Sequence, residues 1–517
     1  SSHNYNVFKP EGKVLEFIAN LQDGEDVPGN ETNVKIGKVR YSSSMRFQKN
    51  MDDVPVYISP KDFLGKRTAL FGMTRTGKSN TVKKIIEATV DISKKARFEL
   101  DNYRGDIISM LDPFDNGAPK FPVGQIIFDI NGEYANPNMQ DEGTAIYELY
   151  KENTIRYSVL EKPGFKVMKV NFYRDITAGF ELVKSYLTGE PGDYVKSMLS
   201  IDFSDLENKQ DQSAVTRHER KISVYLCCLK RAGFKVPDNF KVKFSGNKDL
   251  NEMVQSEGKI DPSKGISLED AINWWSTIWD NYDSKFFTDY KIKKGHEWAD
   301  EDLKALLVFL TRKTKPGGNV NVNGFIKLRG ISNLHTDSTD IPFETDILDS
   351  LRKGRIIIID LSQGDPMVQA LYSERICTKI FQASMQRFVD NKPNNFIQFY
   401  FEEAHNLFPK KDDKDLSQIY NRLAKEGAKL NLGLAYATQE VSSISSNILK
   451  NTQNWFIAHL NNDDELKELK KFYDFEDFTE SLIRFSASTD KGFVRMKTYS
   501  NPFVVPVQID RFSVKGD

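Results

Sequence analysis

The residues with the clearest chemistry form a glycine-bounded loop that begins at Gly72. The pattern G-x-x-x-x-G-K-[ST] is filled by Gly72, Gly77, Lys78 and Ser79. In this pattern the backbone N–H groups turn inward around phosphate oxygens, and the N-terminus of the following helix adds its positive dipole. Lys78 is expected to reach the β- and γ-phosphates of a nucleoside triphosphate, and the Ser79 hydroxyl to bind Mg²⁺. The predicted nucleotide-binding residues are Gly72, Met73, Thr74, Arg75, Thr76, Gly77, Lys78, Ser79 and Asn80.

An acid pair further along the chain is expected to complete a nucleotide-binding site together with this loop. Residues 396–401 form an apolar run that ends at Glu402 and Glu403. This is the Walker B arrangement, in which a buried strand delivers carboxylates beside the phosphates. Glu402 is expected to act through Mg²⁺ and its waters, and Glu403 to polarise the attacking water as a general base. Gln439, after the apolar run 432–437, suits a γ-phosphate sensor, although an ordinary polar residue at a strand end fits the same pattern.

A third strand-like run ends in another acid. Residues 125–129 are apolar up to Asp129, and the turn that follows contains Glu133. Acids at the carboxyl end of a buried parallel strand lie where α/β proteins bind ligands. Asp129 and Glu133 are therefore candidates for Mg²⁺ or water positioning, and solvated acids of a strand-end turn remain the alternative.

A parallel sheet is needed to bring these residues together. Val82, Ile85 and Ile86 recur at helical spacing, which gives the helix behind the glycine loop one face to pack on a sheet. The four isoleucines at 356–359 are typical of a strand that is buried on both faces. Repeated alternation of strands and helices after residue 355 predicts an α/β fold with right-handed crossovers.

The chain of 517 residues is too long for one ordinary core and is expected to form several domains. Turn-rich β-type runs near the start predict a small β-barrel-like domain, whereas the middle of the chain is helical. Trp274, Trp275 and Trp279 recur there at a helical spacing that is more typical of a core than of base stacking. The predicted domains are 4–62, the β-barrel; 63–136, the first part of the α/β core; 137–345, an all-helical insertion; and 346–517, the rest of the core with a C-terminal tail.

Composition limits the classes of protein that remain. A net charge of −1 gives no global basic character, so nucleic acid would have to bind a local patch or an assembled ring. Cys227, Cys228 and Cys377 have no metal-binding spacing and are interpreted as reduced core residues of a cytoplasmic protein. No run of 18 apolar residues and no signal peptide is visible, so the sequence predicts neither a membrane span nor secretion.

These motifs, in this order, resemble the HerA family of hexameric ring ATPases, which is related to FtsK-type DNA translocases. The segments that carry the resemblance are GMTRTGKSNT at 72–81, DINGEY at 129–134, IIIIDLS at 356–362, EEAHNLFP at 402–409, AKEGAKLNLGLAYATQ at 424–439 and SSISSNIL at 442–449. The resemblance also includes a lead-in to the glycine loop like that of the family, and covers about residues 35–135 and 350–510.

The resemblance implies a RecA-like P-loop NTPase core, a small N-terminal β-barrel, and the use of ATP and Mg²⁺. The residue roles that it implies are phosphate and Mg²⁺ binding by Lys78 and Ser79, assistance to the metal by Asp129 and Glu402, base catalysis by Glu403, and sensing by Gln439. Arg67 matches a position where the family places an arginine near the nucleotide.

The partners implied by the resemblance are other copies of the chain and DNA. The family forms homo-hexamers with double-stranded DNA in a central pore. It also works with a separate effector, which is either a NurA-like nuclease or, in bacterial anti-phage defence pairs, a nuclease or a sirtuin-like, NAD-degrading subunit. Lys410, Lys411 and Lys414 are candidates for the pore, with a solvated charged loop as the alternative.

Two departures from the family pattern bear on activity. Asn131 replaces a usual histidine, and Ala428 replaces the arginine that would reach the neighbouring subunit's site. The candidates to replace that arginine are Arg422, Lys425, Lys429 and Arg484, although lysine lacks the planar fork of arginine.

Two functions therefore stay open. The first is a DNA translocase that hydrolyses ATP at subunit interfaces. The second is an ATP-binding hexameric scaffold that assembles and gates an effector with little translocation. A small-molecule P-loop kinase is disfavoured by the acid pair and the large insertion.

Overall fold

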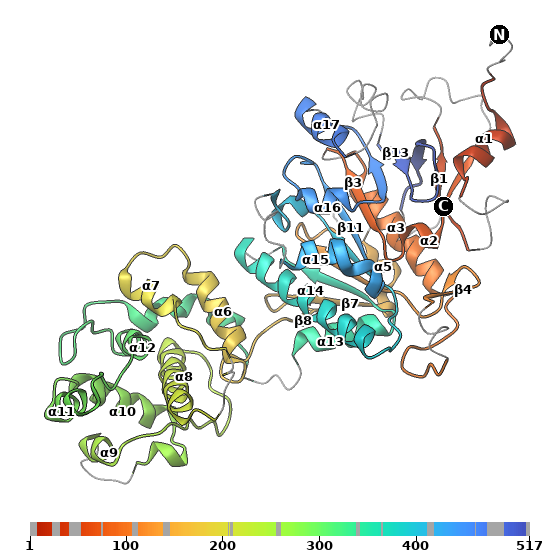
Figure 1. The fold of residues 1–517 in the computed structure, drawn as a ribbon. Coiled ribbons are helices and arrows are strands. Elements are labelled where there is room, and N and C mark those ends of the chain that lie inside the picture. Colours follow the sequence, from red (N-terminus) through yellow and green to blue (C-terminus); the bar gives the residue numbers. More distant parts are fainter. Residues whose placement is uncertain are drawn as a thin grey trace. The chain divides into compact units, whose positions relative to one another are not determined.

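The computed structural model divides the chain into two compact units. Residues Ser1–Val167 and Phe343–Asp517 form the first, and Met168–Pro342 form the second (Figure 1). The structure describes residues 8–22, 32–40, 53–73, 76–105, 112–137, 145–204, 206, 210–254, 260–337, 342–362, 366–410, 418–460, 462–472 and 491–512. The second unit begins later than residue 137, where the sequence placed the start of the insertion, because residues 154–167 still contribute strands to the first unit.

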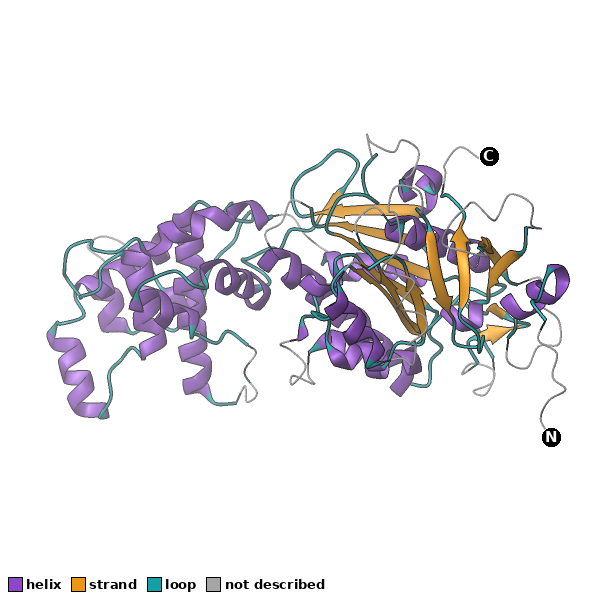
Figure 2. Cartoon of the chain, turned by 90° about the horizontal axis from the view of Figure 1, so that it is seen from above, coloured by secondary structure: helices purple, strands orange, loops and turns teal. Residues whose placement is uncertain are grey.

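A single sheet forms the centre of the first unit, and its strands are orange in Figure 2. It has 12 strands in the order β2-β1-β14-β13-β12-β3-β11-β10-β6-β9-β7-β8. Its strands are β1 (Val34–Val39), β2 (Pro55–Ile58), β3 (Arg67–Phe71), β6 (Gly124–Asp129), β7 (Thr154–Ser158), β8 (Lys166–Val167), β9 (Ile356–Asp360), β10 (Ile397–Phe401), β11 (Leu432–Thr438), β12 (Asn454–Ile457), β13 (Phe493–Lys497) and β14 (Val505–Ile509). Strands β4 (Phe114–Asp115) and β5 (Ala118–Pro119) form a separate two-stranded sheet.

The part of the sheet from β12 to β8 is parallel, which confirms the predicted α/β core. Every residue of β3, β6, β9, β10 and β11 is buried, so these strands need apolar side chains on both faces. The four isoleucines of β9 meet this requirement, as the sequence predicted.

Helices of the first unit cover both faces of this parallel region. The Tyr400 hydroxyl lies 3.3 Å from the Thr89 hydroxyl on α3 (Lys78–Ser93), whereas the next residue, Phe401, packs against Tyr420 on α15 (Ile419–Glu426). Because successive side chains of a strand point to opposite faces, α3 and α15 lie on opposite sides of the sheet. The other helices of this unit are α1 (Gly12–Ala19), α2 (Pro60–Phe63), α5 (Ile146–Leu149), α13 (Phe343–Arg352), α14 (Pro366–Val389), α16 (Ser446–Lys450) and α17 (Asp463–Lys470).

The N-terminal strands extend the core sheet. β1 pairs antiparallel with β14 on one side and with β2 on the other, and β14 continues through β13 to β12. A separate β-barrel over residues 4–62 is therefore not confirmed, and residues 41–52 lie outside the described part of the chain.

The second unit is a helical bundle with an aromatic core. Trp275 is fully buried and its indole N–H donates to the Ser223 hydroxyl at 2.9 Å, while the Trp279 indole N–H donates to the Lys313 carbonyl at 3.0 Å. The tryptophans therefore serve packing, as their spacing predicted. The helices of this unit are α6 (Ile176–Leu187), α7 (Asp193–Leu199), α8 (Gln212–Ala232), α9 (Lys248–Val254), α10 (Leu268–Asp280), α11 (Lys285–Lys294), α12 (Glu301–Thr311) and the 3-10 segments η3 (Pro262–Lys264) and η4 (Gly324–Leu334).

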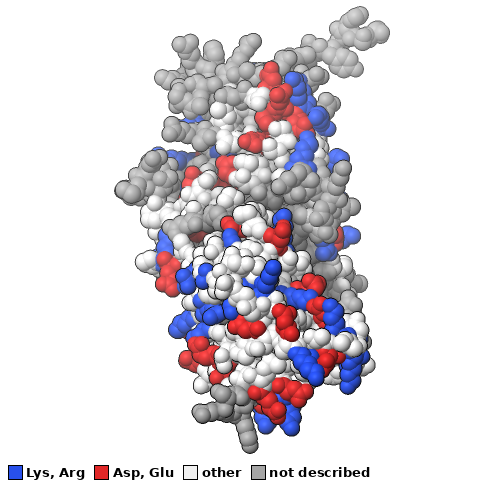
Figure 3. All heavy atoms as spheres, turned by 90° about the vertical axis from the view of Figure 1, so that its left-hand side faces the viewer, with Lys and Arg blue, Asp and Glu red and all other residues white. Residues whose placement is uncertain are grey.

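Three further properties concern the surface charges, the cysteines and the apolar character of the helices. On the face shown in Figure 3, basic and acidic side chains of the described residues are interspersed. Cys227, Cys228 and Cys377 are buried and free. Among the residues that the structure describes, no helix has both the length and the apolar character that crossing a membrane requires.

Candidate nucleotide-binding site

The carboxyl ends of the parallel strands bring the predicted residues to one edge of the sheet. In the strand register, Phe71 of β3 pairs with Thr438 of β11, and Phe401 of β10 pairs with Phe128 of β6. The glycine loop, Gln439, the Glu402–Glu403 pair and the turn after Asp129 therefore open at the same edge. β11 lies between β3 and β10, so the strand that carries Gln439 separates the phosphate loop from the acid pair. This edge is where α/β sheets bind ligands.

The two glycines of the phosphate loop have no room for a side chain. Gly77 has a φ of +102°, which favours glycine, and a Cβ there would lie 2.8 Å from the Gly492 nitrogen. A Cβ on Gly72 would lie 2.7 Å from the Ala458 Cβ. Thr76 closes the loop because its hydroxyl donates to the Met73 carbonyl at 2.8 Å. Thr74 and Arg75, also predicted to bind nucleotide, lie outside the described residues.

Asn80, another residue predicted to bind nucleotide, holds the C-terminal segment instead. Its side-chain amide donates to the Asp510 carbonyl at 3.0 Å, and its side-chain oxygen accepts the Phe512 N–H at 2.8 Å. The Gly492 N–H donates to the Thr76 carbonyl at 3.0 Å. The residues that flank β13 and β14 therefore hold the phosphate loop and the start of α3, a contact that spacing in the sequence does not reveal.

The surroundings of the Lys78 ammonium indicate that this site binds an anion. Its ammonium is buried and has no hydrogen-bond partner. Burial lowers the pKa of Lys78, and the negative charges of Glu403, Glu402 and Glu133 oppose that shift without cancelling it. A buried ammonium without a hydrogen bond is costly unless an anion completes its environment. The β- and γ-phosphates of a nucleotide in the loop would be such an anion.

Glu402 lies beside Ser79, as a Mg²⁺ site requires. The Tyr134 hydroxyl donates to one Glu402 oxygen at 2.6 Å, and the Ser79 hydroxyl also hydrogen-bonds this carboxylate. The pKa of Glu402 is raised to about 7, mainly by burial; the charges of Glu133 and Asp129 contribute to the rise, whereas both hydroxyls oppose it. A divalent cation at this position would favour the ionised form.

The residues fit Mg²⁺ only together with a nucleotide. Among the described residues, no group of three or more histidine, cysteine, aspartate or glutamate side chains could hold a metal ion. Mg²⁺ is commonly bound by one or two protein oxygens, phosphate oxygens and water. Ser79 and Glu402 are suitable protein ligands, and the phosphates and waters would supply the rest.

Glu403 has a strained backbone and an unpaired carboxylate oxygen. Its φ of 44° and ψ of 48° place it in the left-handed region, which is unfavourable for a residue with a side chain. Its Oε2 atom is buried without a hydrogen bond, and the Nδ1 atom of His405 lies 3.5 Å away. Strain of this kind is common at catalytic positions, where the fold holds one side chain in place. The geometry leaves Glu403 able to accept a proton from water.

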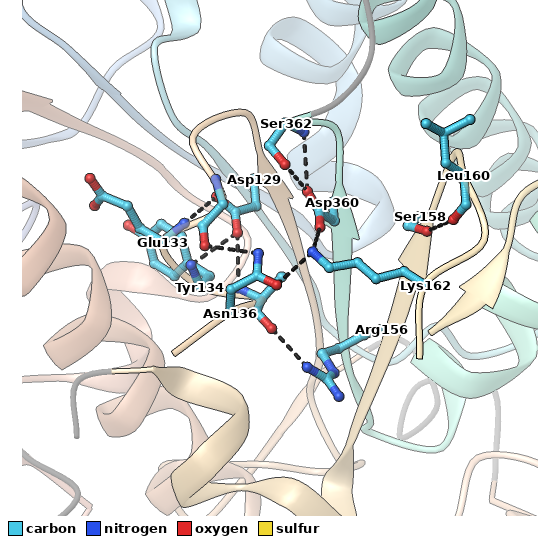
Figure 4. A network of polar contacts seen from close by, with 12 residues as sticks. Asp129, Glu133, Tyr134, Asn136, Arg156, Ser158, Leu160, Lys162, Asp360 and Ser362 are labelled. Carbon is cyan, nitrogen blue, oxygen red and sulfur yellow. Dashed lines mark hydrogen bonds and ion pairs between the residues drawn. The ribbon is translucent and has the colours of Figure 1, made fainter. Parts of the chain in front are cut away.

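Asp129 accepts hydrogen bonds from the backbone of the turn that follows it. One of its carboxylate oxygens accepts the N–H groups of Gly132 and Glu133 at 2.7 and 3.0 Å, and the other accepts those of Tyr134 and Ala135 at 2.9 Å each (Figure 4). Burial raises the pKa of Asp129 to about 6, and these backbone hydrogen bonds oppose the shift. Because backbone amides bond to both oxygens, Asp129 orients the turn that carries Glu133 and Tyr134, and its assistance to a metal ion stays a prediction.

A second network holds the same turn from the neighbouring strand. Lys162 bonds to Asp360 at 2.8 Å and to the Asn136 side chain at 2.6 Å (Figure 4). Burial alone would raise the pKa of Asp360, but Lys162 and Ser362 hold it below its usual value. The prediction did not include Lys162, Asp360 or Tyr134. Only the acid that ends the 356–360 run offered a sequence signal.

Arg67 lies away from the phosphate loop of its own chain. It begins β3, whereas the loop follows the other end of that strand. Its guanidinium donates to the carbonyls of Gly65 and Leu423 at 3.2 and 2.9 Å, and burial lowers its pKa to about 10. The prediction that Arg67 acts at this site is therefore not supported within one subunit.

The remaining predicted residues fall into three groups. Gln439 directly follows β11 at the site edge. Lys410 forms an ion pair with Glu468 at 3.0 Å, which argues against a lysine that is free to bind DNA in a pore. Lys411, Lys414 and Arg484 lie outside the described residues. Arg422 packs over the Phe381 ring, with 4.4 Å between the guanidinium carbon and the ring centre.

Glu402→Gln is expected to stabilise the nucleotide-free protein at pH 8 by about 3 kcal/mol and to have little effect at pH 4. The pKa of Glu402 is about 7 in the folded state, whereas an unfolded glutamate titrates near about 4.3. Between these values the unfolded chain loses the proton first, so wild-type stability falls as the pH rises through that window. Glutamine has no such proton to lose.

Urea unfolding of the nucleotide-free protein at the two pH values measures this difference. Glu440→Gln is the matched control, because Glu440 is exposed and its carboxylate accepts only the Ser443 hydroxyl among the hydrogen bonds described for it. An equal effect of Glu402→Gln at both pH values would contradict the assigned environment.

Sequence comparison finds similarity to helicases of the HerA family. Residues 34–99 match the family described as Helicase HerA, central domain. A DNA double-strand break repair helicase HerA from Sulfolobus acidocaldarius is 25% identical over 238 residues, which is 45% of this chain and 44% of that protein. The HerA helicase of Sulfurisphaera tokodaii is 25% identical over 174 residues, covering 33% of this chain and 34% of its own length. The matches thus span less than half of each relative.

Solved structures resemble the chain more distantly. VirB4 of Thermoanaerobacter pseudethanolicus is 11% identical with a TM-score of 0.40, and the match covers 93% of this chain and 97% of that one. The genome packaging NTPase B204 of Sulfolobus turreted icosahedral virus 2, in complex with ATP-gammaS, is 14% identical with a TM-score of 0.25 over 34% of this chain and 72% of its own. These scores are too low to support a conclusion about function. The match of residues 34–99 to the HerA central domain, the two related helicases and the phosphate loop on its parallel sheet support a relationship between this chain and the HerA family.

Proposed function

We propose that the protein is a Mg²⁺-dependent ATPase that works as a ring-forming motor on double-stranded DNA. The observation that carries the ATPase proposal is the buried Lys78 ammonium, which has no hydrogen-bond partner and lies between the phosphate loop and the acid pair. Both related helicases are described as acting in DNA double-strand break repair, which supports DNA as the partner.

In this proposal, different residues bind the phosphates, bind Mg²⁺, accept the proton of the attacking water and contact the γ-phosphate. The backbone N–H groups of the loop at 72–77 and Lys78 bind the phosphates, and the helix dipole of α3 adds positive potential. Mg²⁺, bound through Ser79 and Glu402, would neutralise charge on the phosphates. Glu403 takes the proton of the attacking water, and Gln439 contacts the γ-phosphate from the end of β11.

The ring, the pore and the effector rest on the family resemblance. A hexamer would set each nucleotide against a neighbouring subunit. Because that subunit also carries Ala428, a basic residue at another position of the neighbouring subunit would have to contact the phosphates. With a net charge of −1, a pore must concentrate its basic residues to hold the DNA backbone. A separate effector, such as a NurA-like nuclease or a nuclease or sirtuin-like NAD-degrading subunit in anti-phage defence, would use the motor.

The test is steady-state ATP hydrolysis by the full chain with Mg²⁺, with and without linear duplex DNA, together with the mass of the assembly in solution. We expect measurable turnover, a several-fold increase with DNA, and the mass of a hexamer in the presence of ATP. ATP binding without turnover in either condition would overturn the autonomous motor.

A second candidate function is an ATP-binding scaffold with slow hydrolysis. The observation that favours it is Ala428, because the family resemblance implies an arginine at this position that would reach the next subunit, and alanine has no guanidinium. Arg422, which could replace it, pairs with Glu426 at 3.4 Å and packs on Phe381.

A further inference from the structure

His405 connects the proposed general base with the strand that carries the proposed sensor. Its Nδ1 atom lies 2.9 Å from the Thr438 hydroxyl oxygen and 3.5 Å from the Oε2 atom of Glu403. Thr438 is fully buried, is the last residue of β11 and directly precedes Gln439. A single nitrogen atom therefore faces both the acid and the sensor strand.

Thr438 is also bonded to the phosphate loop. Its carbonyl oxygen accepts the Gly72 N–H at 3.3 Å, at the first residue of that loop. Its hydroxyl oxygen accepts the Glu440 N–H at 3.0 Å, just beyond Gln439. A shift of Gly72 or of Gln439 on nucleotide binding would therefore move the hydroxyl that contacts His405.

The hydrogen-bonding capacity of these groups permits two arrangements. A hydroxyl has one proton, and each imidazole nitrogen either donates or accepts. If Thr438 donates its proton to Nδ1, that nitrogen has no proton to offer to Glu403. This arrangement agrees with the lack of a hydrogen bond at Oε2 of Glu403. If Nδ1 carries the proton, Thr438 and Glu403 compete for it. The partner of Nδ1 thus sets the hydrogen bonding of the Glu403 carboxylate.

We propose that His405 is a positioning residue that orients Glu403 for proton abstraction and links that orientation, through Thr438, to the phosphate loop and the sensor. This proposal rests on the proposed ATPase function. His405 does not contact the nucleotide in this scheme. It changes the rate of the chemical step and leaves nucleotide affinity nearly unchanged.

The strained backbone of Glu403 does not by itself fix the orientation of its carboxylate, so a second residue is needed to hold it. The backbone of Glu403 is in the left-handed conformation, and its Oε2 atom is buried without a hydrogen bond that would fix the orientation of the carboxylate. His405 is close enough to Oε2 to restrict this rotation when the distance of 3.5 Å shortens to a hydrogen bond. Catalytic hydrogen bonds are often long in nucleotide-free structures and shorten in the reactive complex.

The test compares two pairs of variants by steady-state hydrolysis and by ATP binding. His405→Ala is expected to lower kcat by about 10- to 100-fold with a change in KM below about 2-fold. His405→Asn, whose side-chain amide can occupy the Nδ1 position, is expected to recover most of the rate. Thr438→Val should lower kcat in the same way, whereas Thr438→Ser keeps the hydroxyl and should resemble the wild type.

The double variant His405→Ala/Thr438→Val is expected to be no slower than the slower single variant, because both changes break one connection. Wild-type turnover by His405→Ala, a His405→Asn protein as slow as His405→Ala, or equal rates for Thr438→Val and Thr438→Ser would each overturn the proposal while leaving the ATPase function intact. If His405→Ala does not fold, the Thr438 pair and His405→Asn still decide the question. A wild-type protein that binds ATP without hydrolysing it would overturn the proposed function and this proposal together.

Discussion

Lys78→Met is expected to abolish ATP hydrolysis, by about 10³-fold or more, without lowering the stability of the nucleotide-free protein. Burial lowers the pKa of Lys78 even though three nearby acids attract its charge. The charged ammonium therefore destabilises the folded protein when no nucleotide is bound. Methionine has a similar length and no charge, and it keeps the packing of the aliphatic chain. The same substitution removes the phosphate contact, so nucleotide affinity falls.

Thermal unfolding with and without Mg²⁺ and ATP, together with steady-state hydrolysis, checks both parts of this prediction. For the wild type, ATP at 100 times its Kd should add about 2.7 kcal/mol of stability, and Lys78→Met should lose this gain. Lys94→Met is the matched control, because Lys94 directly follows α3 and forms an exposed ion pair with Asp91. A Lys78→Met protein that turns over ATP, or that unfolds more easily when nucleotide-free, would contradict the assignment.

The phosphate loop could be predicted because its chemistry fixes its spacing. Two glycines must approach other backbone segments closely, and one lysine must reach the phosphates, so few sequences satisfy the pattern. The structure places those two glycines against Ala458 and Gly492. The core strands could be predicted for a related reason. A strand buried on both faces, such as β9, needs a continuous apolar run.

Contacts between distant segments could not be predicted in the same way. The hydrogen bond between Tyr134 and Glu402 joins residues 268 positions apart, and it depends on β6 and β10 being neighbours in the sheet. The role of Asp129 depends on the direction of the backbone in the turn, which the sequence pattern of an acid after a strand leaves open. Likewise, β1 joins the core sheet only through β14, which lies at the other end of the chain.

The proposed roles of the two glutamates differ in a way that the structure explains and the sequence does not. Glu402 is almost fully buried and receives hydrogen bonds from two hydroxyls, which suits a fixed metal ligand. Glu403 is half-buried, strained and has an oxygen without a hydrogen bond, which suits a group that exchanges a proton. Glu402 and Glu403 are adjacent in the sequence, but their carboxylates therefore have different environments because they contact different side chains at the edge of the sheet.

Glu403→Gln is expected to bind ATP with Mg²⁺ at least as tightly as the wild type and to hydrolyse it about 10²- to 10⁴-fold more slowly. Glutamine occupies the same space but accepts no proton. It also removes one negative charge close to the site of the phosphates, which favours an anionic ligand. Equilibrium ATP binding and single-turnover hydrolysis measure the two effects separately. Glu440→Gln is the control on the same edge of the sheet, and a Glu403→Gln protein with wild-type turnover would exclude Glu403 as the base.

The same variant separates a motor from a scaffold. A motor converts each hydrolysis step into movement, so Glu403→Gln should stop displacement of a third strand from triplex DNA even when ATP saturates the protein. A scaffold needs only bound ATP, so Glu403→Gln should keep the ATP-dependent assembly, measured as mass in solution, together with DNA binding. Wild-type triplex displacement that Glu403→Gln abolishes, with assembly retained, would establish that hydrolysis drives translocation. Assembly without displacement in both proteins would instead favour the scaffold, and Ala428 would then mark the missing contact between subunits.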